Sequence, residues 1–356
     1  MKSLTVDAGD ERYDVLVGRL EDNRSRLAAL ARGNPLVVVS EPRVWGLHGA
    51  RLEALLPCDP ILVPEGEAAK DWPHLRDLIQ AFADRNLDRG STIAAFGGGS
   101  VGDLTGLAAG LFKRGIPLIH LPTTLLAQAD SAVGGKTAID ALGQKNLVGM
   151  FHQPRMVIAD VSLLETLDPR QLRAGYAEVV KYGLIRHEAL FEWAEDHGAI
   201  LLAGHHEYRE EAVWQSVAAK ARMVEADITD RNGARALLNF GHTFGHALES
   251  AAGLGTLLHG EAVAVGMVLA FDLSAELGHC PHDDARRVRA HLAAVGLPTT
   301  IAETGVDRAA LLPLMRTDKK NDSGALRLVL TEGIGEAFLS EGVEERVLAD
   351  FLARAA

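Results

Sequence analysis

This chain of 356 residues contains few cysteines and no long apolar run. Its two cysteines, Cys58 and Cys280, lie far apart and in no metal-binding spacing, so we interpret both as reduced thiols. No apolar run reaches the ~18 residues that a membrane span needs. The N-terminal stretch MKSLTVDAGD also lacks the apolar core of a signal peptide. We therefore expect a cytoplasmic protein with no membrane partner.

Positive charge is also scarce, since 36 Lys and Arg face 48 Asp and Glu, giving a net charge of −12. This balance argues against a nucleic-acid partner, because binding to a phosphate backbone needs a basic face. It leaves room for a local basic pocket that holds a small phosphorylated substrate. The length of the chain, with no internal repeat or low-complexity linker, predicts two domains.

The first half of the chain alternates short apolar runs with helical pattern. After a hairpin at 4–6 and 13–17, strands are predicted at 36–39, 60–63, 92–96, 118–121 and 156–160. Apolar strands separated by helices are typical of a parallel sheet covered on both faces. We therefore predict an α/β, Rossmann-like, NAD-binding domain at 1–165.

The second half has mainly helical pattern. The pair Asp168-Pro169 is typical of a helix start. Helices are predicted at 170–185, 188–195, 207–228, 239–252, 260–277 and 284–295, and a late hairpin at 326–330 and 336–339. We predict that the second domain, 166–356, is mainly helical, and that an all-helical framework within it binds the metal.

A glycine-rich turn, FGGGSVGD at residues 96–103, directly follows the predicted strand 92–96. Glycines there let backbone N–H groups approach a pyrophosphate, and the next helix N-terminus favours negative charge. The turn departs from the fingerprint GxGxxG, so a simple tight strand-to-helix turn stays open. Asp103 is expected in the first helical turn, near the nucleotide.

Histidines cluster in NFGHTFGHALE (239–249) and LHGEAV (258–263). His242 and His246 are four residues apart on one helix face, and this spacing alone favours them as a pair of metal ligands. A lone buried histidine is usually an ordinary core residue, but this cluster is dense. Glu178 and Lys181, in AGYAEVVKYG, are either a simple helix pair or a carboxylate ligand beside a cation.

Several cations could form a basic pocket within this acidic chain. The segment DSAVGGKTAIDALGQKN (130–146) is glycine-rich and is expected to be loop-like. Each cation alone is typical of a solvated surface, whereas together they suit a phosphorylated sugar acid. The candidates are Arg114, Lys136, Lys145, Lys220, Arg235, Lys319 and Lys320.

Six motifs resemble, in order and spacing, those of the 3-dehydroquinate synthases, a family of sugar phosphate cyclases. They are GGGSVGDLTGLAAG, LPTTLLAQADSAVGGKTAID, KNLVGMFHQP, AGYAEVVKYG, LLNFGHTFGHALE and LHGEAVAVGM. The resemblance runs through residues 65–330. It implies conversion of 3-deoxy-D-arabino-heptulosonate 7-phosphate to 3-dehydroquinate and phosphate. The implied route is transient oxidation by NAD, phosphate elimination, re-reduction and intramolecular aldol closure, with NAD and Zn²⁺ or Co²⁺ as cofactors.

The resemblance also implies a role for each matching residue. Glu178, His242 and His259 match the metal ligands, so His246 becomes a catalytic substrate contact and the pair inferred from spacing is replaced. The other catalytic matches are Lys136, Lys181, Lys220, Arg235 and Asn239. Substrate-binding matches are Asp130, Asn146, Arg114, Lys319 and Lys320, with Arg114 expected to cross the interface of a homodimer. NAD-binding matches are Glu67, Lys70, Gly98, Gly99, Asp103, Thr123, Thr124 and Lys145.

One position departs from the family pattern. After the strand 36–39 the family usually has Thr-Asp or Thr-Asn near the adenosine, whereas this chain has Ser40-Glu41. A glutamate can still accept a hydrogen bond from a ribose hydroxyl, so Glu41 is expected in the NAD site with altered contacts.

Other functions compete with this interpretation. Aminodehydroquinate synthase would have nearly the same pocket and stays open. The 2-epi-5-epi-valiolone synthases are disfavoured by Arg235, Asn239 and His246. A glycerol-dehydrogenase-like oxidoreductase shares the fold but needs fewer pocket cations, and a non-enzymatic NAD-binding or scaffold protein would not need the metal residues.

Overall fold

The structure, a computed structural model, describes residues 1–230, 233–253, 255–318 and 325–355. The chain forms two compact units. Unit 1 comprises Met1–Asp168 and His206–Thr229, and unit 2 comprises Pro169–His205 and Asp230–Ala356. Within the described part of the chain, no helix combines the length and the apolar character that crossing a membrane requires.

Unit 1 is built on a seven-stranded sheet with the order β1-β2-β9-β6-β5-β3-β4. Only β1 runs antiparallel to its neighbour, β2. The strands are β1 (Lys2–Ala8), β2 (Glu11–Val17), β3 (Leu36–Ser40), β4 (Cys58–Leu62), β5 (Ile93–Gly97), β6 (Leu118–Pro122) and β9 (Met156–Ala159). Each of the seven predicted strands is therefore confirmed, within a few residues at its ends.

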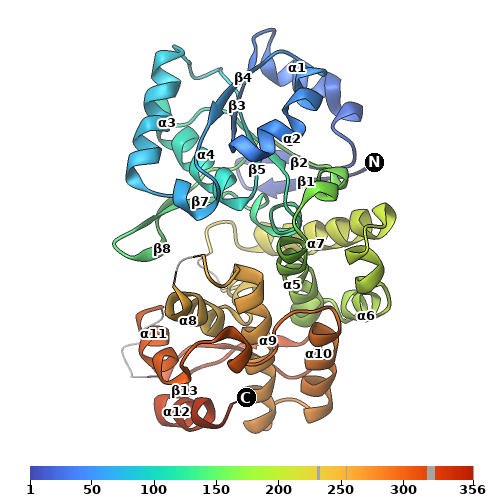
Figure 1. Ribbon diagram of the computed structural model, residues 1–356, viewed down its shortest axis with the longest axis vertical. Coiled ribbons are helices and arrows are strands. Elements are labelled where there is room, and N and C mark those ends of the chain that lie inside the picture. Colours follow the sequence, from blue (N-terminus) through green and yellow to red (C-terminus); the bar gives the residue numbers. More distant parts are fainter. Residues whose placement is uncertain (231–232, 254, 319–324, 356) are drawn as a thin grey trace. The chain divides into compact units, whose positions relative to one another are not determined.

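The central strands are apolar on both sides because helices cover both faces of the sheet (Figure 1). Val37 and Ile93 pack on one face with Leu104 of α4, while Val38 and Ala94 pack on the other. Strand side chains alternate between faces, so strands buried on both sides need a nearly continuous apolar run. The helices are α1 (Arg24–Ala31), α2 (Pro42–Glu53), α3 (Trp72–Asp84) and α4 (Gly99–Leu111).

The segment at 130–146, expected to be loop-like, is instead mostly a β-hairpin, and that prediction was wrong. Strand β7 (Lys136–Ala141) pairs antiparallel with β8 (Gln144–Phe151) around Leu142 and Gly143. Thr137 and Ile139 are buried on one side of β7. This alternation is the mark of a strand, and the abundance of glycine around it concealed the pattern.

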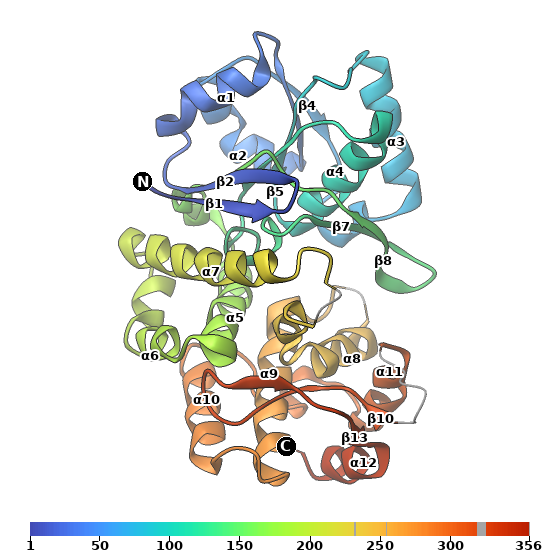
Figure 2. The same cartoon turned by 180° about the vertical axis from the view of Figure 1, so that it is seen from behind.

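Helix α7 (His206–Ala226) belongs to unit 1, where it packs on β1 and β2 (Figure 2). The predicted domains, 1–165 and 166–356, differ from the two units in the placement of this helix. Its predicted bounds, 207–228, nevertheless agree closely with the observed ones.

Unit 2 is mainly helical, as predicted. Its central helix, α9 (His259–Glu276), is mostly apolar, and its residues from Ala262 to Ala275 are buried apart from Asp272. A helix that is apolar on nearly every side requires neighbours on those sides. The other helices are α5 (Pro169–Arg186), α6 (Glu188–Leu202), α8 (His242–Ala252), α10 (His282–Ala294), α11 (Leu311–Asp318) and α12 (Glu345–Arg354).

Short strands complete unit 2. The predicted late hairpin is confirmed as β11 (Val329–Thr331) paired with β12 (Ala337–Leu339). A second pair, β10 (Ala325–Leu326) with β13 (Val343–Glu344), was not predicted, nor were α11 and α12. Two-residue strands carry too little alternation to be recognised in a sequence.

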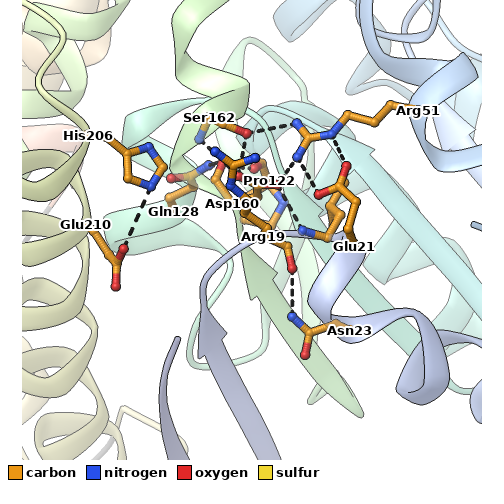
Figure 3. A network of polar contacts seen from close by, with 11 residues as sticks. Arg19, Glu21, Asn23, Arg51, Pro122, Gln128, Asp160, Ser162, His206 and Glu210 are labelled. Carbon is orange, nitrogen blue, oxygen red and sulfur yellow. Dashed lines mark hydrogen bonds and ion pairs between the residues drawn. The ribbon is translucent and has the colours of Figure 1, made fainter.

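A buried carboxylate after β9 joins three segments of unit 1 (Figure 3). Asp160 is fully buried, and its Oδ2 accepts hydrogen bonds from the Leu20 amide at 2.9 Å and from Arg51 Nη2 at 2.7 Å. Its Oδ1 accepts from the amide and the hydroxyl of Ser162, at 3.0 and 2.6 Å. Arg51 also pairs with the partly exposed Glu21. Asp160 thus satisfies several buried donors at once.

We predict that Asp160→Ala lowers the free energy of unfolding by about 3–5 kcal/mol, because it leaves a partly buried guanidinium, two backbone amides and a hydroxyl without their acceptor. The control is Glu21→Ala, which removes the exposed partner of the same arginine and should cost less than about 1 kcal/mol. Urea denaturation of both variants measures the difference. Equal effects would show that Asp160 is not a central contact.

Candidate active site

The nucleotide-binding candidates of unit 1 lie at the carboxyl ends of three neighbouring parallel strands. In the sheet register Ser40 pairs with Phe96, and Gly97 pairs with Pro122. Glu41, Gly98 and Thr123 therefore follow the ends of β3, β5 and β6. Strands β3 and β5 are neighbours in the sheet. The strand that follows β3, β4, lies on one side of this pair, and the strand that follows β5, β6, lies on the other side. Such a switch in strand order is where open α/β sheets bind their ligands.

The glycine turn begins helix α4, as predicted. Gly98 is the N-cap of α4, whose free N–H groups and dipole favour an anion. A pocket at the turn is lined by residues that include Gly99, Asp103, His120 and Ser131. Asp103 lies at the start of the second helical turn, rather than in the first turn as predicted, because the helix begins at Gly99.

Lys70 connects four predicted site residues in what we call the Lys70 cluster, made of Glu67, Lys70, Asp103 and Asn146. Its Nζ is 2.8 Å from Asp103 Oδ2 and 3.6 Å from Glu67 Oε2, and it also donates to Asn146 Oδ1. Lys70 is buried, which alone would lower its pKa. The Asp103 and Glu67 carboxylates outweigh this effect and raise the pKa of Lys70, so the side chain stays cationic.

A second pair of predicted residues, Asp130 and Lys220, is joined directly. Lys220 Nζ donates to the backbone oxygen of Asp130 at 2.7 Å and lies 3.0 Å from its carboxylate. Lys220 extends from α7, and Asp130 lies in a π-helical turn, η4 (Ala127–Ser131). Because both residues belong to unit 1, the inclusion of α7 in this unit explains how they meet.

The remaining candidates of unit 1 are placed but not joined into one cluster. Glu41 Oε1 accepts a hydrogen bond from the Gly66 amide at 2.8 Å, and Thr124 Oγ1 accepts from the Ala127 amide at 3.1 Å. Lys136 is exposed at the start of β7, after a glycine turn whose Gly134 amide donates to Tyr13 Oη at 3.0 Å. Arg114 and Lys145 are exposed as well.

In unit 2, two glycines allow three helices to approach closely. A Cβ on Gly260, the second residue of α9, would lie 1.8 Å from the backbone oxygen of Ala174 in α5. A Cβ on Gly266 would lie 2.0 Å from the backbone oxygen of Gly241, just before α8. No side chain fits at these distances, so α9 contacts both α5 and α8 through backbone. Glu178, one turn after Ala174, thereby meets the first residue of α9, His259.

The three predicted metal ligands come together, and we call them the ligand cluster: Glu178, His242 and His259. One ligand atom of each lies within 4.8 Å of the other two. Glu178 Oε1 is 3.6 Å from His242 Nε2 and 3.3 Å from His259 Nε2. Both Glu178 oxygens are buried and lack a well-formed hydrogen bond among the described residues, although Lys181 Nζ contacts Oε2. A carboxylate and two imidazoles around a shared space fit a divalent metal.

The hydrogen bonds behind the ligands fit this interpretation. His242 Nδ1 lies 3.1 Å from the Phe240 carbonyl oxygen, which can only accept, so Nδ1 carries the proton. Burial also holds the pKa of His242 well below its ordinary value, which keeps the ring neutral. Its Nε2 therefore directs a lone pair at the Glu178 carboxylate, and a cation between these atoms would satisfy both.

His259 faces carboxylates on both sides. Burial alone would lower its pKa, but the nearby carboxylates of Glu178 and Glu249 outweigh this and raise the pKa of His259 to about 10. A proton thus occupies Nε2 where a metal would bind, and metal binding releases such protons. Lys181 and the two histidines hold the pKa of Glu178 well below its ordinary value, against the effect of burial. Glu178 is therefore ionised, as a carboxylate ligand of a metal must be.

Other predicted residues of unit 2 lie on α8 or in the turn just before it. The His246 ring is 5.5 Å from that of His242 and 6.0 Å from that of His259. Arg235 is buried and Asn239 half-buried in the 3-10 turn η6 (Arg235–Asn239), which precedes α8. Lys319 and Lys320 lie outside the described residues.

Glu249 was missed by the sequence analysis. Its Oε2 lies 3.1 Å from His259 Nδ1. Glu249 also forms, with His246 and His259, a second group of residues that could hold a metal. Its position seven residues after His242 puts it on the same face of α8, so the signal was present in NFGHTFGHALE. His120, which lines the glycine-turn pocket, gave no comparable signal.

The chain matches two family descriptions. The description "3-dehydroquinate synthase N-terminal" covers residues 60–174, and "3-dehydroquinate synthase C-terminal" covers residues 175–321. A 3-dehydroquinate synthase of Ruegeria sp. (strain TM1040) is 45% identical over 359 residues, covering 98% of this chain and 96% of the relative. One of Nitrobacter winogradskyi is 46% identical over 368 residues, with coverage of 99% and 96%.

Solved structures with the same fold include other cyclases. A 2-deoxy-scyllo-inosose synthase with carbaglucose-6-phosphate, NAD⁺ and Co²⁺ has a TM-score of 0.89 at 26% identity, covering 100% of each chain. The 2-epi-5-epi-valiolone synthase of Streptomyces hygroscopicus, with NAD⁺ and Zn²⁺ bound, has a TM-score of 0.88 at 29% identity, covering 96% of each chain. A glycerol dehydrogenase of Schizosaccharomyces pombe, at 17% identity and a TM-score of 0.64, shares the fold alone.

We predict that Gly260→Ala destabilises the protein by about 1–3 kcal/mol, since the new Cβ forces α9 away from α5. Because His259 is the adjacent residue, the variant should also bind Zn²⁺ more weakly. Gly46→Ala is the control: it lies in α2 with open space around a new Cβ, and it should stabilise by about 0.5–1 kcal/mol. Urea denaturation and zinc titration test both. A Gly260→Ala variant as stable as Gly46→Ala would refute the backbone contact.

Proposed function

This chain belongs to the 3-dehydroquinate synthase family, and on that premise we propose how its side chains divide the work of the family reaction. The reaction converts 3-deoxy-D-arabino-heptulosonate 7-phosphate to 3-dehydroquinate and phosphate, with no net redox change. The observation that carries the proposal is the ligand cluster, in which a buried carboxylate and two histidine nitrogens face one another. The cofactors are NAD and a divalent metal, Zn²⁺ or Co²⁺.

Unit 1 is proposed to hold NAD. The N-terminus of α4, with Gly98 and Gly99, would receive the pyrophosphate, as strand-to-helix turns of this kind do. The Lys70 cluster supports this assignment, because its buried ammonium and carboxylates have fixed positions next to the same helix. Glu41, Thr123, Thr124 and Lys145 complete the proposed NAD contacts.

Unit 2 is proposed to hold the metal through Glu178, His242 and His259. A metal bound there would supply Lewis-acid chemistry for the oxidation of a hydroxyl, and NAD would supply the transient hydride transfer. Lys181 keeps Glu178 ionised by its contact with Oε2, so the carboxylate remains available to a cation. The two histidines each present Nε2 to the same space.

The substrate is proposed to be held mainly by charge. Lys136, Lys220 and Arg235, with Lys319 or Lys320, are proposed to bind carboxylate and phosphate oxygens. Asp130 supports the role of Lys220, since it fixes the ammonium by two contacts. Asn239 and His246 are proposed to orient hydroxyl oxygens and protons. No side chain is assigned as the sole general base, because the substrate phosphate itself carries basic oxygens.

We also propose a homodimer that acts in the cytoplasm. The family resemblance implies that Arg114 reaches the phosphate bound by the partner. The exposure of Arg114 supports this proposal, because the side chain is accessible to a second chain.

The activity is tested by phosphate release from purified protein with Zn²⁺ and NAD. We expect release from the heptulosonate phosphate, with a coupled dehydroquinase producing the absorbance of dehydroshikimate. Sedoheptulose 7-phosphate is the comparison substrate and should give none. Release from sedoheptulose 7-phosphate alone would move the chain to the valiolone synthases, whereas no release from either substrate would favour a simple dehydrogenase.

The ligand assignment is tested by His259→Ala with His246→Ala as its matched control. We expect His259→Ala to lose metal and activity together, because it removes one of three ligands. His246→Ala should keep the metal and lose activity, because His246 is proposed to contact substrate instead. Elemental analysis and turnover measure the two properties separately. Metal retained in His259→Ala, or lost in His246→Ala, would overturn the assignment.

A further inference from the structure

A buried glutamate stands directly behind one of the proposed metal ligands. Glu249 lies on α8, on the face that carries His242 and His246, and its side chain is 3% exposed. Its Oε2 is 3.1 Å from Nδ1 of His259, the ring nitrogen that faces away from Glu178. The imidazole of His259 is therefore held between two carboxylates, one on each nitrogen.

The two histidines of the ligand cluster differ in this respect. The Nδ1 of His242 donates to a backbone oxygen, of Phe240, whereas the Nδ1 of His259 donates to a carboxylate. A carboxylate behind a ligand histidine fixes which nitrogen keeps the proton, orients the ring and makes the other nitrogen a stronger ligand. His259 needs this support more than His242 does, because its side chain is 32% exposed, against 12% for His242.

We propose that Glu249 is a positioning residue that holds His259 in its metal-binding orientation and strengthens its bond to the metal. The inference rests on the proposed metal site and deepens it. Glu249 does not contact the metal or the substrate in this account. Its carboxylate keeps the proton on Nδ1, so that Nε2 alone is offered to the cation together with Glu178 and His242.

An alternative use of the same residues is a second metal site. His246, Glu249 and His259 each offer an atom within 4.8 Å of the other two. With Nε2 of His259 already used by the ligand cluster, this arrangement would require His259 to give both ring nitrogens to metals and to lose its remaining proton. Protein sites ordinarily use one nitrogen as ligand and donate the other N–H to an acceptor, which is the arrangement that Glu249 provides. We therefore favour one metal per chain.

The test compares Glu249→Ala and Glu249→Gln with the wild-type protein. Each is stripped of metal, and its affinity for Zn²⁺ is measured by competition with a coloured chelator. We expect Glu249→Ala to bind Zn²⁺ about 10–100-fold more weakly. Glu249→Gln should lie between Glu249→Ala and the wild type, because the amide oxygen can still accept from Nδ1 without supplying charge. Glu276→Gln, on the exposed far end of α9, is the matched control and should bind normally.

Two further measurements separate this role from a merely structural one. Denaturation is followed with and without Zn²⁺, and the loss of stability in Glu249→Ala should be larger in the zinc-loaded protein. The visible spectrum of the Co²⁺ form should also change in Glu249→Ala, because the ring of His259 would be held less firmly.

Each other outcome overturns a defined part of the proposal. Unchanged Zn²⁺ affinity in Glu249→Ala would refute the role of Glu249 while leaving the metal site intact. Equal destabilisation with and without Zn²⁺ would assign Glu249 to packing alone. A wild-type protein that binds two Zn²⁺ with equal strength would establish the second site instead, and one that binds none would refute the proposed metal site itself.

Discussion

The close backbone contact between α9 and its neighbours is the constraint on which the candidate metal site depends. Gly260 and Gly266 leave no side chain between α9 and the backbones of α5 and the residues before α8. His259 can meet Glu178 and His242 only at that separation. Buried apolar side chains on most sides of α9 fix the helix in the interior of unit 2, so packing energy spread over many residues determines the position of three polar ones.

In unit 1, too, the packing of apolar elements places the polar residues, and here the elements are strands. The ends of β3, β5 and β6 bring Ser40-Glu41, the glycine turn and Thr123 to one edge of the sheet. The positive charges of this acidic chain are then held individually, Lys70 by Asp103 and Lys220 by Asp130. Carboxylates near each buried ammonium offset part of the cost of burying it. A chain with a large negative net charge can thus keep buried cations available for an anionic ligand.

The sequence was most informative where a pattern extends over many residues. The parallel strands and the long helices were predicted because alternating or continuous apolar runs reflect burial. The family motifs singled out Glu178 and His259 across a wide gap in the chain, and these residues lie close together in the structure. The four-residue spacing favoured His246 over His259 as the partner of His242, because spacing within one helix cannot show that a residue of another helix lies nearby. The hairpin of β7 and β8 was missed because the glycines on either side of β7 resemble a loop. Glu249 was missed because its partner lies on another helix, although both residues were quoted in the motifs.

The ligand cluster also has a thermodynamic consequence for unit 2. Its three residues come from α5, α8 and α9, so the cluster exists only when these helices are packed together. An ion that binds the folded unit and not the unfolded chain adds its binding free energy to the stability of the fold. Each tenfold rise in free metal above the dissociation constant would then stabilise the folded state by about 1.4 kcal/mol. The supply of metal in the cell would therefore govern the lifetime of the protein as well as its turnover.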